Sequence, residues 1–241
     1  MKKSLWDEKS SKYPRYSGNL GIFHEGLYLN LIEMGIEFKN KSLIDIGCGT
    51  GIWSLFFSDK CSEILGIDSS EKMLEILTKD ATKFGVKNIF SKCLTWDEYN
   101  DDKHYDIALC SMSPAIKTTK HFEKFNKCAK VKIFINFNRP RHSDLLEVFF
   151  KHYGINNRDG GSASELKSWL QSNNISYNQL FFGESRMAKR SKNEALQNIF
   201  WHLEICGTKY SKKEVEQVFN SLYKNDVIEE KIDSLITLFV F

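Results

Sequence analysis

The chain has 241 residues, of which 41% are hydrophobic, and a formal net charge of +3. This length suits one α/β domain with an insertion, and the apolar fraction supports a substantial core. The net charge is too small to imply binding to nucleic acid, and no hydrophobic run is long enough to span a bilayer.

The cysteines, the histidines and the first residues bear on metals and on the compartment. The six cysteines contain no Cys-x-x-Cys pair, and the six histidines have no metal-ligand spacing, so the sequence predicts no metal site. The segment Met1–Asp7 lacks the apolar core of a signal peptide. We therefore expect a reduced, cytoplasmic protein that does not act at a membrane.

Strands and helices alternate from residue 42 onward, after an initial segment with one expected helix near 20–36. The expected strands lie near 42–47, 62–67, 87–92, 105–110, 131–136, 174–182 and 232–241. The expected helices lie near 51–59, 70–84, 118–129, 143–153, 162–173, 191–206 and 211–224. This alternation predicts a doubly wound, seven-stranded, mostly parallel sheet with helices on both faces.

We expect a single domain over residues 1–241 that consists of a core and two outer segments. The core covers 42–183 and 232–241, while 1–41 is an N-terminal cap segment and 184–231 is a helical insert before the last strand. Ligands of such sheets bind outside the carboxyl ends of the strands. We therefore expect both outer segments to fold over that edge as a substrate lid.

The first expected strand leads into a glycine-rich turn. Leu43, Ile44 and Ile46 suit a strand that is covered on both faces. Gly47 and Gly49 permit backbone torsions that other residues avoid, so the main chain can approach a ligand closely. The helix that follows directs its amide donors and its positive dipole end toward the same place. The turn is therefore expected to cradle a polar, nucleotide-like ligand.

The glycine spacing narrows the choice of nucleotide. A dinucleotide fingerprint needs a third glycine three places after the second, but Ile52 stands there. Instead the chain has Gly-x-Gly-x-Gly with an acid just before it, which resembles motif I of the class I S-adenosylmethionine (SAM)-dependent methyltransferases. In that family the loop lies beside the amino-acid end and the ribose of SAM, and the acid orders the methionine end. The resemblance implies cofactor contacts for Asp45, Gly47, Cys48, Gly49 and Gly51.

The next expected strand ends in a second acid, Asp68, which lies 21 positions after Gly47. A carboxylate there can accept two hydrogen bonds from vicinal ribose hydroxyls. A helix then opens with serine as a plausible N-cap. The run Gly-Ile-Asp-x-Ser-x-x-Met-Leu also resembles the family, which implies that Asp68 binds the ribose and that Ser69 and Met73 lie beside the cofactor. The last strand of this family is antiparallel and lies beside the fifth.

The loop after the third expected strand departs from the family pattern. Many members carry an aspartate in contact with the adenine amino group where this chain has Thr95. Thr95 can replace it through its hydroxyl or backbone, or Asp97 can reach in. Trp96 either stacks on the adenine ring or anchors the loop in the core.

The loop after the fourth expected strand is Ser111-Met112-Ser113-Pro114. Family members that methylate amines of DNA, glutamine or rRNA adenine carry Asn/Asp-Pro-Pro-Tyr/Phe here, so that specificity is not supported. Ser111 and Ser113 either hydrogen-bond SAM or substrate, or shape the turn around Pro114.

The segment Tyr13-Pro14-Arg15-Tyr16 resembles the short N-terminal segment that closes over SAM in many small-molecule methyltransferases. The resemblance implies that Tyr16 contacts the carboxylate end of the cofactor. The alternative is a surface segment that packs through Trp6 and Tyr13.

No catalytic base is identified from the sequence. His24 in the expected cap helix and His202 in the insert are the two histidines that lie in the expected lid, where an imidazole can act as a base near neutral pH. Arg139 and Arg141 follow the fifth expected strand and are candidates for anchoring an anionic small substrate, because arginine binds a carboxylate bidentately.

The resemblance implies a SAM-dependent methyltransferase that moves a methyl group to a small-molecule acceptor by in-line displacement and releases S-adenosylhomocysteine (SAH). We expect a monomer or a homodimer. One alternative is an RNA or protein methyltransferase that docks through basic residues such as Lys117, Lys120, Lys124 and Lys127, although their helical spacing favours a solvated face. Another alternative is a SAM-binding protein without transferase activity.

Overall fold

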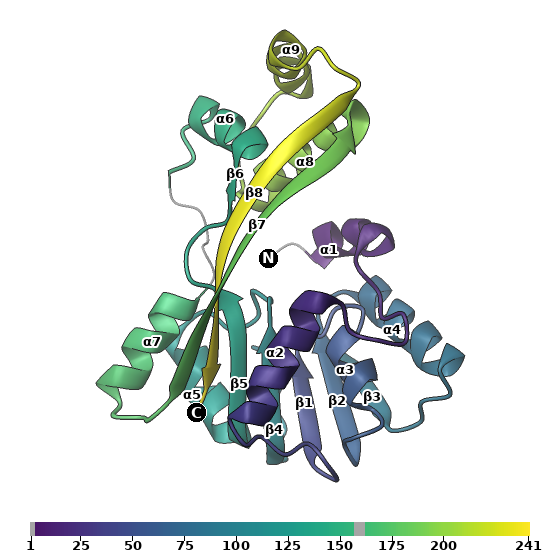
Figure 1. Cartoon of the computed structure of the whole chain (residues 1–241), viewed down its shortest axis with the longest axis vertical. Helices are drawn as coiled ribbons and strands as arrows, with labels where there is room; N and C mark the ends of the chain where they lie inside the picture. Colours follow the sequence, from purple (N-terminus) through teal and green to yellow (C-terminus); the bar gives the residue numbers. More distant parts are fainter. Residues whose placement is uncertain (1–2, 157–161) are drawn as a thin grey trace.

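The computed structural model describes residues 3–156 and 162–241. Within these residues the strands form one sheet in the order β3-β2-β1-β4-β5-β8-β6, and β7 pairs with β8 (Figure 1). The strands are β1 (Ser42–Ile46), β2 (Glu63–Asp68), β3 (Ile89–Cys93), β4 (Tyr105–Ser111), β5 (Ala129–Phe137), β6 (His142–Ser143), β7 (Asn178–Ser191) and β8 (Val227–Val240).

The helices fill the connections between these strands. They are α1 (Lys3–Lys9), α2 (Ile22–Glu33), α3 (Ile52–Phe57), α4 (Glu71–Lys83), α5 (Thr119–Cys128), α6 (Asp144–His152), α7 (Ala163–Ser172), α8 (Lys192–Ile205) and α9 (Lys212–Leu222), with a short 3-10 helix at Ser10–Lys12. No helix among the described residues is both long enough and apolar enough to cross a membrane.

The predicted fold class is confirmed. Strands β1 to β5 are mutually parallel where they pair, and β8 lies antiparallel beside β5. The described sheet has eight strands instead of seven because the two-residue β6 pairs with β8 through His142↔Asp233 and Ser143↔Ile232.

Each face of the sheet is buried under a different set of helices, because successive side chains of a strand point to opposite faces. On β1, Ile44 and Ile46 pack in a core with α5 and α7, whereas Leu43 packs in a core with α2 and α3. Phe57 of α3 is fully buried in the second core. The carboxyl ends of β1, β2 and β4 therefore meet at one edge between two helical layers.

The hairpin of β7 and β8 differs from the prediction. The expected strand at 174–182 starts later and continues to Ser191, so that β7 pairs with β8 from Asn178↔Val240 to Ser191↔Val227. Both ends of the expected helical insert, 184–231, are therefore strand, and the hairpin rises out of the sheet as an arm (Figure 1). The polar run after Gly183 gives no strand pattern because most of its side chains are exposed.

The two helices expected inside the insert are present as α8 and α9. Ser191 and Glu194 form a reciprocal capping box at the start of α8, and Ser211 accepts the amide of Glu214 at the start of α9. Both helices pack with α6 and Ile228 of β8 in a separate apolar cluster on the arm.

We predict that alanine at Gly51 destabilises the fold, whereas alanine at Gly26 does not. Gly51 has φ +81°, and an added Cβ would lie 2.2 Å from Leu77 Cδ1. Gly51→Ala should therefore lower the free energy of unfolding by about 2 kcal/mol or more. Gly26 lies inside α2 with open space around it, so Gly26→Ala should raise the free energy by about 0.5–1 kcal/mol. Urea unfolding of both variants provides the measurement, and equal losses would contradict this view of the turn.

Candidate functional site

The glycine turn after β1 is held against β2 by two main-chain hydrogen bonds. The amides of Gly47 and Cys48 donate to the carbonyl oxygen of Ile67 at 2.7 and 3.0 Å. Gly47 has φ +70°, and a Cβ at this position would lie 1.9 Å from Ser113 Oγ. Only glycine allows the β1 and β4 loops to come this close.

The carboxylate of Asp68 connects two loops at the end of the sheet. Its Oδ2 accepts the amide of Gly49 at 2.9 Å, and its Oδ1 accepts the amide of Ser70 at 2.8 Å. Burial raises the pKa of Asp68, and the amide donors oppose that rise. The carboxylate is therefore preorganised at the point where the glycine turn meets the N-terminus of α4.

Asp45, at the end of β1, is only 2% exposed, and its Oδ2 accepts a hydrogen bond from Ser54 Oγ at 2.6 Å. Burial raises the pKa of Asp45 to about 7. A cationic ligand beside this carboxyl group would favour its ionised form.

These loops enclose a cavity of about 210 Å³ at the carboxyl ends of β1, β2 and β4. The structure brings together most of the residues predicted to bind a cofactor. Those that line the cavity are Asp45, Gly47, Cys48, Gly49, Asp68, Ser69, Met73, Thr95, Trp96 and Ser111. Gly51 is not in the lining, and its tight packing against Leu77 gives it a role in shaping the turn.

Tyr16, which the sequence predicts to contact the cofactor, is not in the lining of this cavity, whereas Tyr13 is. The ring of Tyr16 packs edge-on against Phe84, with centroids 5.3 Å apart. Between the two tyrosines, Arg15 forms a two-point ion pair with the buried Asp80 of α4. This anchor directs Tyr16 toward Phe84, and the hydrogen bond of 2.6 Å from Thr50 Oγ1 to the carbonyl oxygen of Pro14 holds the segment over the glycine turn.

Helix α1 is also fastened beside the cavity. Asp7 Oδ1 accepts hydrogen bonds from Ser70 Oγ at 2.5 Å and from the amide of Lys72 at 3.3 Å, at the N-terminus of α4. An acid at a helix N-terminus is favoured by the helix dipole. Trp6 lines the cavity from the same helix. From the sequence, Trp6 and Tyr13 are expected only as packing residues. A Trp or Tyr in a cap segment carries no pattern that distinguishes a packing residue from one that lines a cavity.

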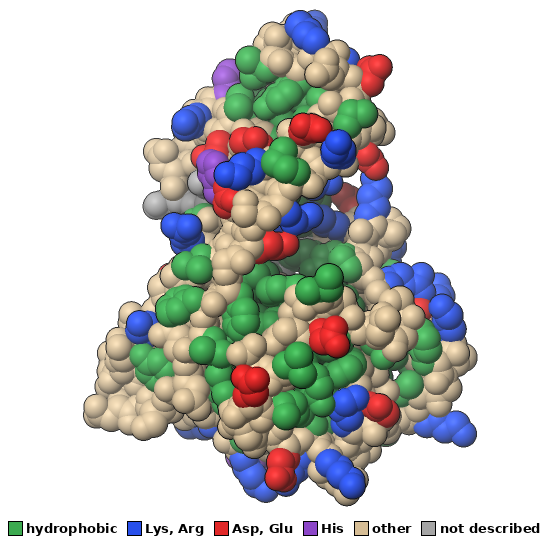
Figure 2. All heavy atoms as spheres, in the orientation of Figure 1, with side chains coloured by type: hydrophobic (Ala, Val, Ile, Leu, Met, Phe, Trp, Pro, Cys, Tyr) green, Lys and Arg blue, Asp and Glu red, His purple; other side chains and the backbone are tan. Residues whose placement is uncertain are grey.

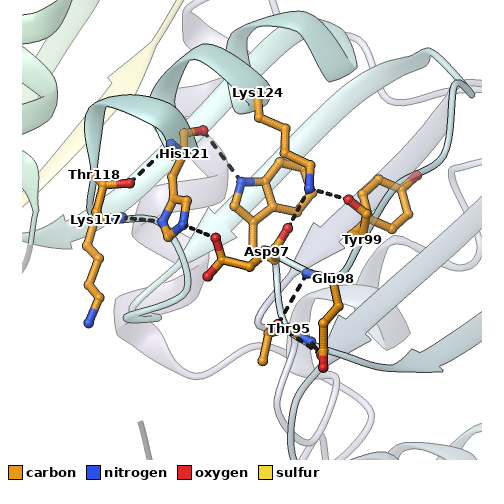
Figure 3. Close-up of polar contacts among 9 residues, drawn as sticks. Thr95, Asp97, Glu98, Tyr99, Lys117, Thr118, His121 and Lys124 are labelled. Atoms are coloured by element: carbon orange, nitrogen blue, oxygen red, sulfur yellow. Dashed lines mark hydrogen bonds and ion pairs between the residues drawn. The ribbon is translucent and has the colours of Figure 1, made fainter.

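The loop after β3 is fixed by side chains that stand around it (Figure 3). The amide and the hydroxyl of Thr95 donate to Glu98 Oε2 at 2.7 and 2.9 Å, so Thr95 forms a closed turn. Asp97 Oδ1 lies 2.9 Å from His121 Nε2 of α5, and both residues line the cavity (Figure 3). The hydrogen-bonding groups on this wall are thus ordered in the ligand-free protein.

Trp96 anchors this loop. Trp96 is only 2% exposed. Its ring stacks on that of Tyr99, with centroids 5.3 Å apart and an interplanar angle of 12°. Lys124 of α5 donates to the carbonyl oxygens of Trp96, at 2.6 Å, and of Tyr99 (Figure 3). Of the two interpretations of Trp96, the core anchor agrees with its burial, and the residue is also part of the cavity lining. Lys124 is accordingly not part of a solvated face.

The opposite wall consists of α2, α3 and the β4 loop. Trp53 Nε1 donates to Ser111 Oγ at 3.0 Å, and the His24 ring packs edge-on against Trp53 with centroids 5.3 Å apart. Ser113 Oγ accepts the amide of Ala115 at 3.2 Å, which is the turn interaction expected near Pro114. Burial lowers the pKa of His24 below its ordinary value of 6.5, so this cavity-lining imidazole is neutral at pH 7.

No group of three or more His, Cys, Asp or Glu side chains comes together as a metal site within 3–156 and 162–241. The other candidates lie apart from the cavity. His202 lies in α8, in edge contact with Phe150, and Arg139 is exposed.

Part of this chain is similar to known methyltransferases. Residues 43–131 match the family model described as "Methyltransferase domain". A ubiquinone biosynthesis O-methyltransferase of Nitrosospira multiformis is 24% identical over 160 residues, which is 63% of this chain and 63% of that protein. An uncharacterized protein of Methanocaldococcus jannaschii is 35% identical over 117 residues, 45% of this chain and 30% of that protein. The chain thus spans less than two thirds of the length of either relative.

A solved structure has the same fold along nearly its entire length. A SAM-dependent methyltransferase from Geobacter sulfurreducens, in complex with S-adenosyl-L-homocysteine, superposes with a TM-score of 0.55 at 14% identity. The superposition covers 99% of this chain and 97% of that one.

We predict that the free energy of unfolding of Asp45→Asn increases relative to that of the wild type as the pH rises from 5 to 7.5. The pKa of Asp45 is raised from 3.8 to about 7. Between these values the unfolded chain releases a proton that the folded chain retains, so stability falls with rising pH. Asparagine mimics the protonated acid and lacks this fall. Urea unfolding of both proteins at the two pH values measures the difference, and a difference that does not change with pH would contradict the raised pKa.

Proposed function

We propose that this chain is a class I SAM-dependent methyltransferase whose cavity binds SAM. The methyl group of SAM is transferred to a small-molecule acceptor, and SAH is released. The observation that carries the proposal is the Asp68 carboxylate, half-buried and oriented by Gly49 and Ser70 beside the glycine turn. Such a group is suited to bind two vicinal hydroxyls of a ribose.

The remaining cavity residues fit the other parts of this cofactor. Asp45 lies at the end of β1 and lines the cavity, so it can balance the ammonium group of the methionine end. Gly49 has φ +56°, and a Cβ there would have only Tyr13 as a neighbour, at 3.8 Å. The main chain therefore borders open space where a ligand can approach. SAM supplies an activated sulfonium methyl group, and the protein contributes placement and exclusion of water.

A small acceptor is favoured by the cover over the cavity. Trp6 and Tyr13 line it from the N-terminal segment, and Asp7 and the carbonyl oxygen of Pro14 fasten that segment to α4 and to the glycine turn. A macromolecular substrate would need this cover to move away. The name of the relative from Nitrosospira multiformis, a ubiquinone biosynthesis O-methyltransferase, also favours a small acceptor.

We further propose His24 as the general base for an acceptor that loses a proton. It is the histidine that faces the Trp53 and Ser111 wall of the cavity, and its neutral form can accept a proton at pH 7. His121, which also lines the cavity, is engaged by Asp97 and by the amide of Lys117.

A cytoplasmic location remains part of this proposal. The six cysteines are all free thiols, and Cys93 and Cys206 are exposed, which suits a reducing compartment. We propose a monomer or a homodimer.

We predict that Asp68→Asn weakens SAH binding at least tenfold in calorimetric titration, because the amide offers a neutral acceptor and one donor in place of a carboxylate. Asp59→Asn is the matched control, since Asp59 is a largely exposed partner of Lys60 and lies beyond the C-terminal end of α3, away from the glycine turn. Its affinity should equal that of the wild type. If the wild-type protein binds neither SAM nor SAH, the proposed function is wrong.

We predict that His24→Asn lowers kcat about 100-fold for a hydroxyl acceptor while the Kd of SAH changes less than twofold. The assay is transfer of labelled methyl groups from SAM to small phenols, which are protonated at neutral pH, and it is pursued on the best acceptor. Because burial lowers the pKa of His24 below 6.5, the wild-type rate should fall to half of its plateau only at a pH below 6.5. The exposed His104 provides the control variant His104→Asn. Full activity in His24→Asn would exclude this base.

A further inference from the structure

A second group of charged side chains lies between α1 and the arm. We define the arm cluster as four cations, Lys9, Arg141, Arg186 and Arg190, and two carboxylates, Glu184 and Glu230. Figure 2 shows Lys and Arg side chains along the hollow that separates the arm from the lower body of the molecule. Alternation along β7 places Arg186 and Arg190 on one face of the arm.

The members of the arm cluster are within electrostatic reach of one another. Burial, together with the smaller effect of the charges of Arg141 and Arg190, lowers the pKa of Lys9 to about 8. Burial also lowers the pKa of Arg141, whose neighbours are Glu230, Arg186, Arg190 and Glu184. Four cations thus share one partly desolvated region with two carboxylates, which leaves an excess of positive charge in the cluster.

Two ion pairs hold the arginines of β7 in place. Arg190 Nε lies 2.6 Å from Glu230 Oε2, and Glu230 is fully buried and also accepts Ser143 Oγ at 2.6 Å. Arg186 Nε lies 3.4 Å from Glu184 Oε1. A guanidinium that is held by one edge keeps donors on its other edge, because the planar group has five N–H bonds.

The arm cluster is continuous with the cofactor cavity through aromatic side chains. Lys9 Nζ lies 3.3 Å from the ring centroid of Trp201 of α8, and Trp201 contacts Trp6 with centroids 5.4 Å apart. Trp6 and Tyr13 line the cavity. The charges of Asp68 and Arg141 both act on the pKa of Tyr13, which burial raises. Tyr13 is therefore within electrostatic reach of both sites.

We propose that the arm cluster binds an anionic group of the methyl acceptor, a carboxylate or a phosphate, through Lys9, Arg141 and Arg190. This inference rests on the proposed methyl transfer. Arginine pairs both kinds of anion bidentately, and lysine adds a point charge. Trp6 and Trp201 offer ring surface to the part of the acceptor between its anion and the reacting atom. Arg141 thus keeps the role expected from the sequence, whereas the exposed Arg139 does not share it.

The test is titration of the protein with benzoate and with inorganic phosphate, each in the presence and in the absence of saturating SAH. The wild type should bind at least one of the two anions. Arg141→Gln and Lys9→Gln should weaken that binding at least tenfold and leave the Kd of SAH within twofold of wild type. Binding of benzoate alone indicates a carboxylate on the acceptor, and binding of phosphate alone indicates a phosphate.

A matched control lies on the same strand. Lys189 points to the other face of β7 and pairs with Glu229 at 3.1 Å, so Lys189→Gln removes the same charge and should not change anion binding. The single variant Arg190→Gln would leave the buried Glu230 carboxylate without its arginine partner. The double variant Arg190→Gln/Glu230→Gln is therefore used instead, and it should lose anion binding while it stays folded.

The inference is overturned if the wild type binds neither anion, or if the cluster variants and Lys189→Gln bind equally well. Failure of the wild type to bind SAH is a separate result that counts against the proposed function, and the titrations without SAH still decide whether the arm cluster binds anions.

Discussion

The site depends on one carboxylate that is held by two loops. Asp68 accepts the amide of Gly49 from the glycine turn and the amide of Ser70 from the start of α4. Ser70 in turn donates to Asp7, which fixes α1 beside the cavity. The cofactor wall, the second helix layer and the N-terminal cover are thus joined at the end of β2. A group that binds a ligand here also organises the elements that enclose it.

Much of the core was predictable because its pattern is local. Short apolar runs such as Leu43–Ile46 mark strands that are buried on both faces, and positive-φ glycines mark the turn that follows. The arm was not predictable, because Gly183–Ser191 is exposed and polar and forms a strand only through pairing with β8. Strand formation there depends on a partner more than thirty residues away, which no local pattern indicates.

The candidate site likewise contains some residues that the sequence places and others that only the tertiary structure places. Asp45 and Asp68 follow buried strands, so their positions at the edge of the sheet come directly from the topology. Tyr13 and Tyr16 flank the same Pro-Arg pair. Which of the two tyrosines lines the cavity depends on the ion pair of Arg15 with Asp80 of α4, a contact that is distant in the sequence. The proximity of Lys9 to the arginines of the arm likewise follows from tertiary structure, since α1 and β7 lie far apart in the sequence.

The central claim is that the cavity at the ends of β1, β2 and β4 is a SAM site, and a crystal structure of the protein with SAH tests it most directly. We expect the ribose hydroxyls on Asp68, the amino-acid end beside Asp45 and the Gly47 turn, and the adenine against the loop of Thr95 to Asp97. SAH bound elsewhere, or a cavity without SAH in a crystal grown at saturating SAH, would contradict the claim.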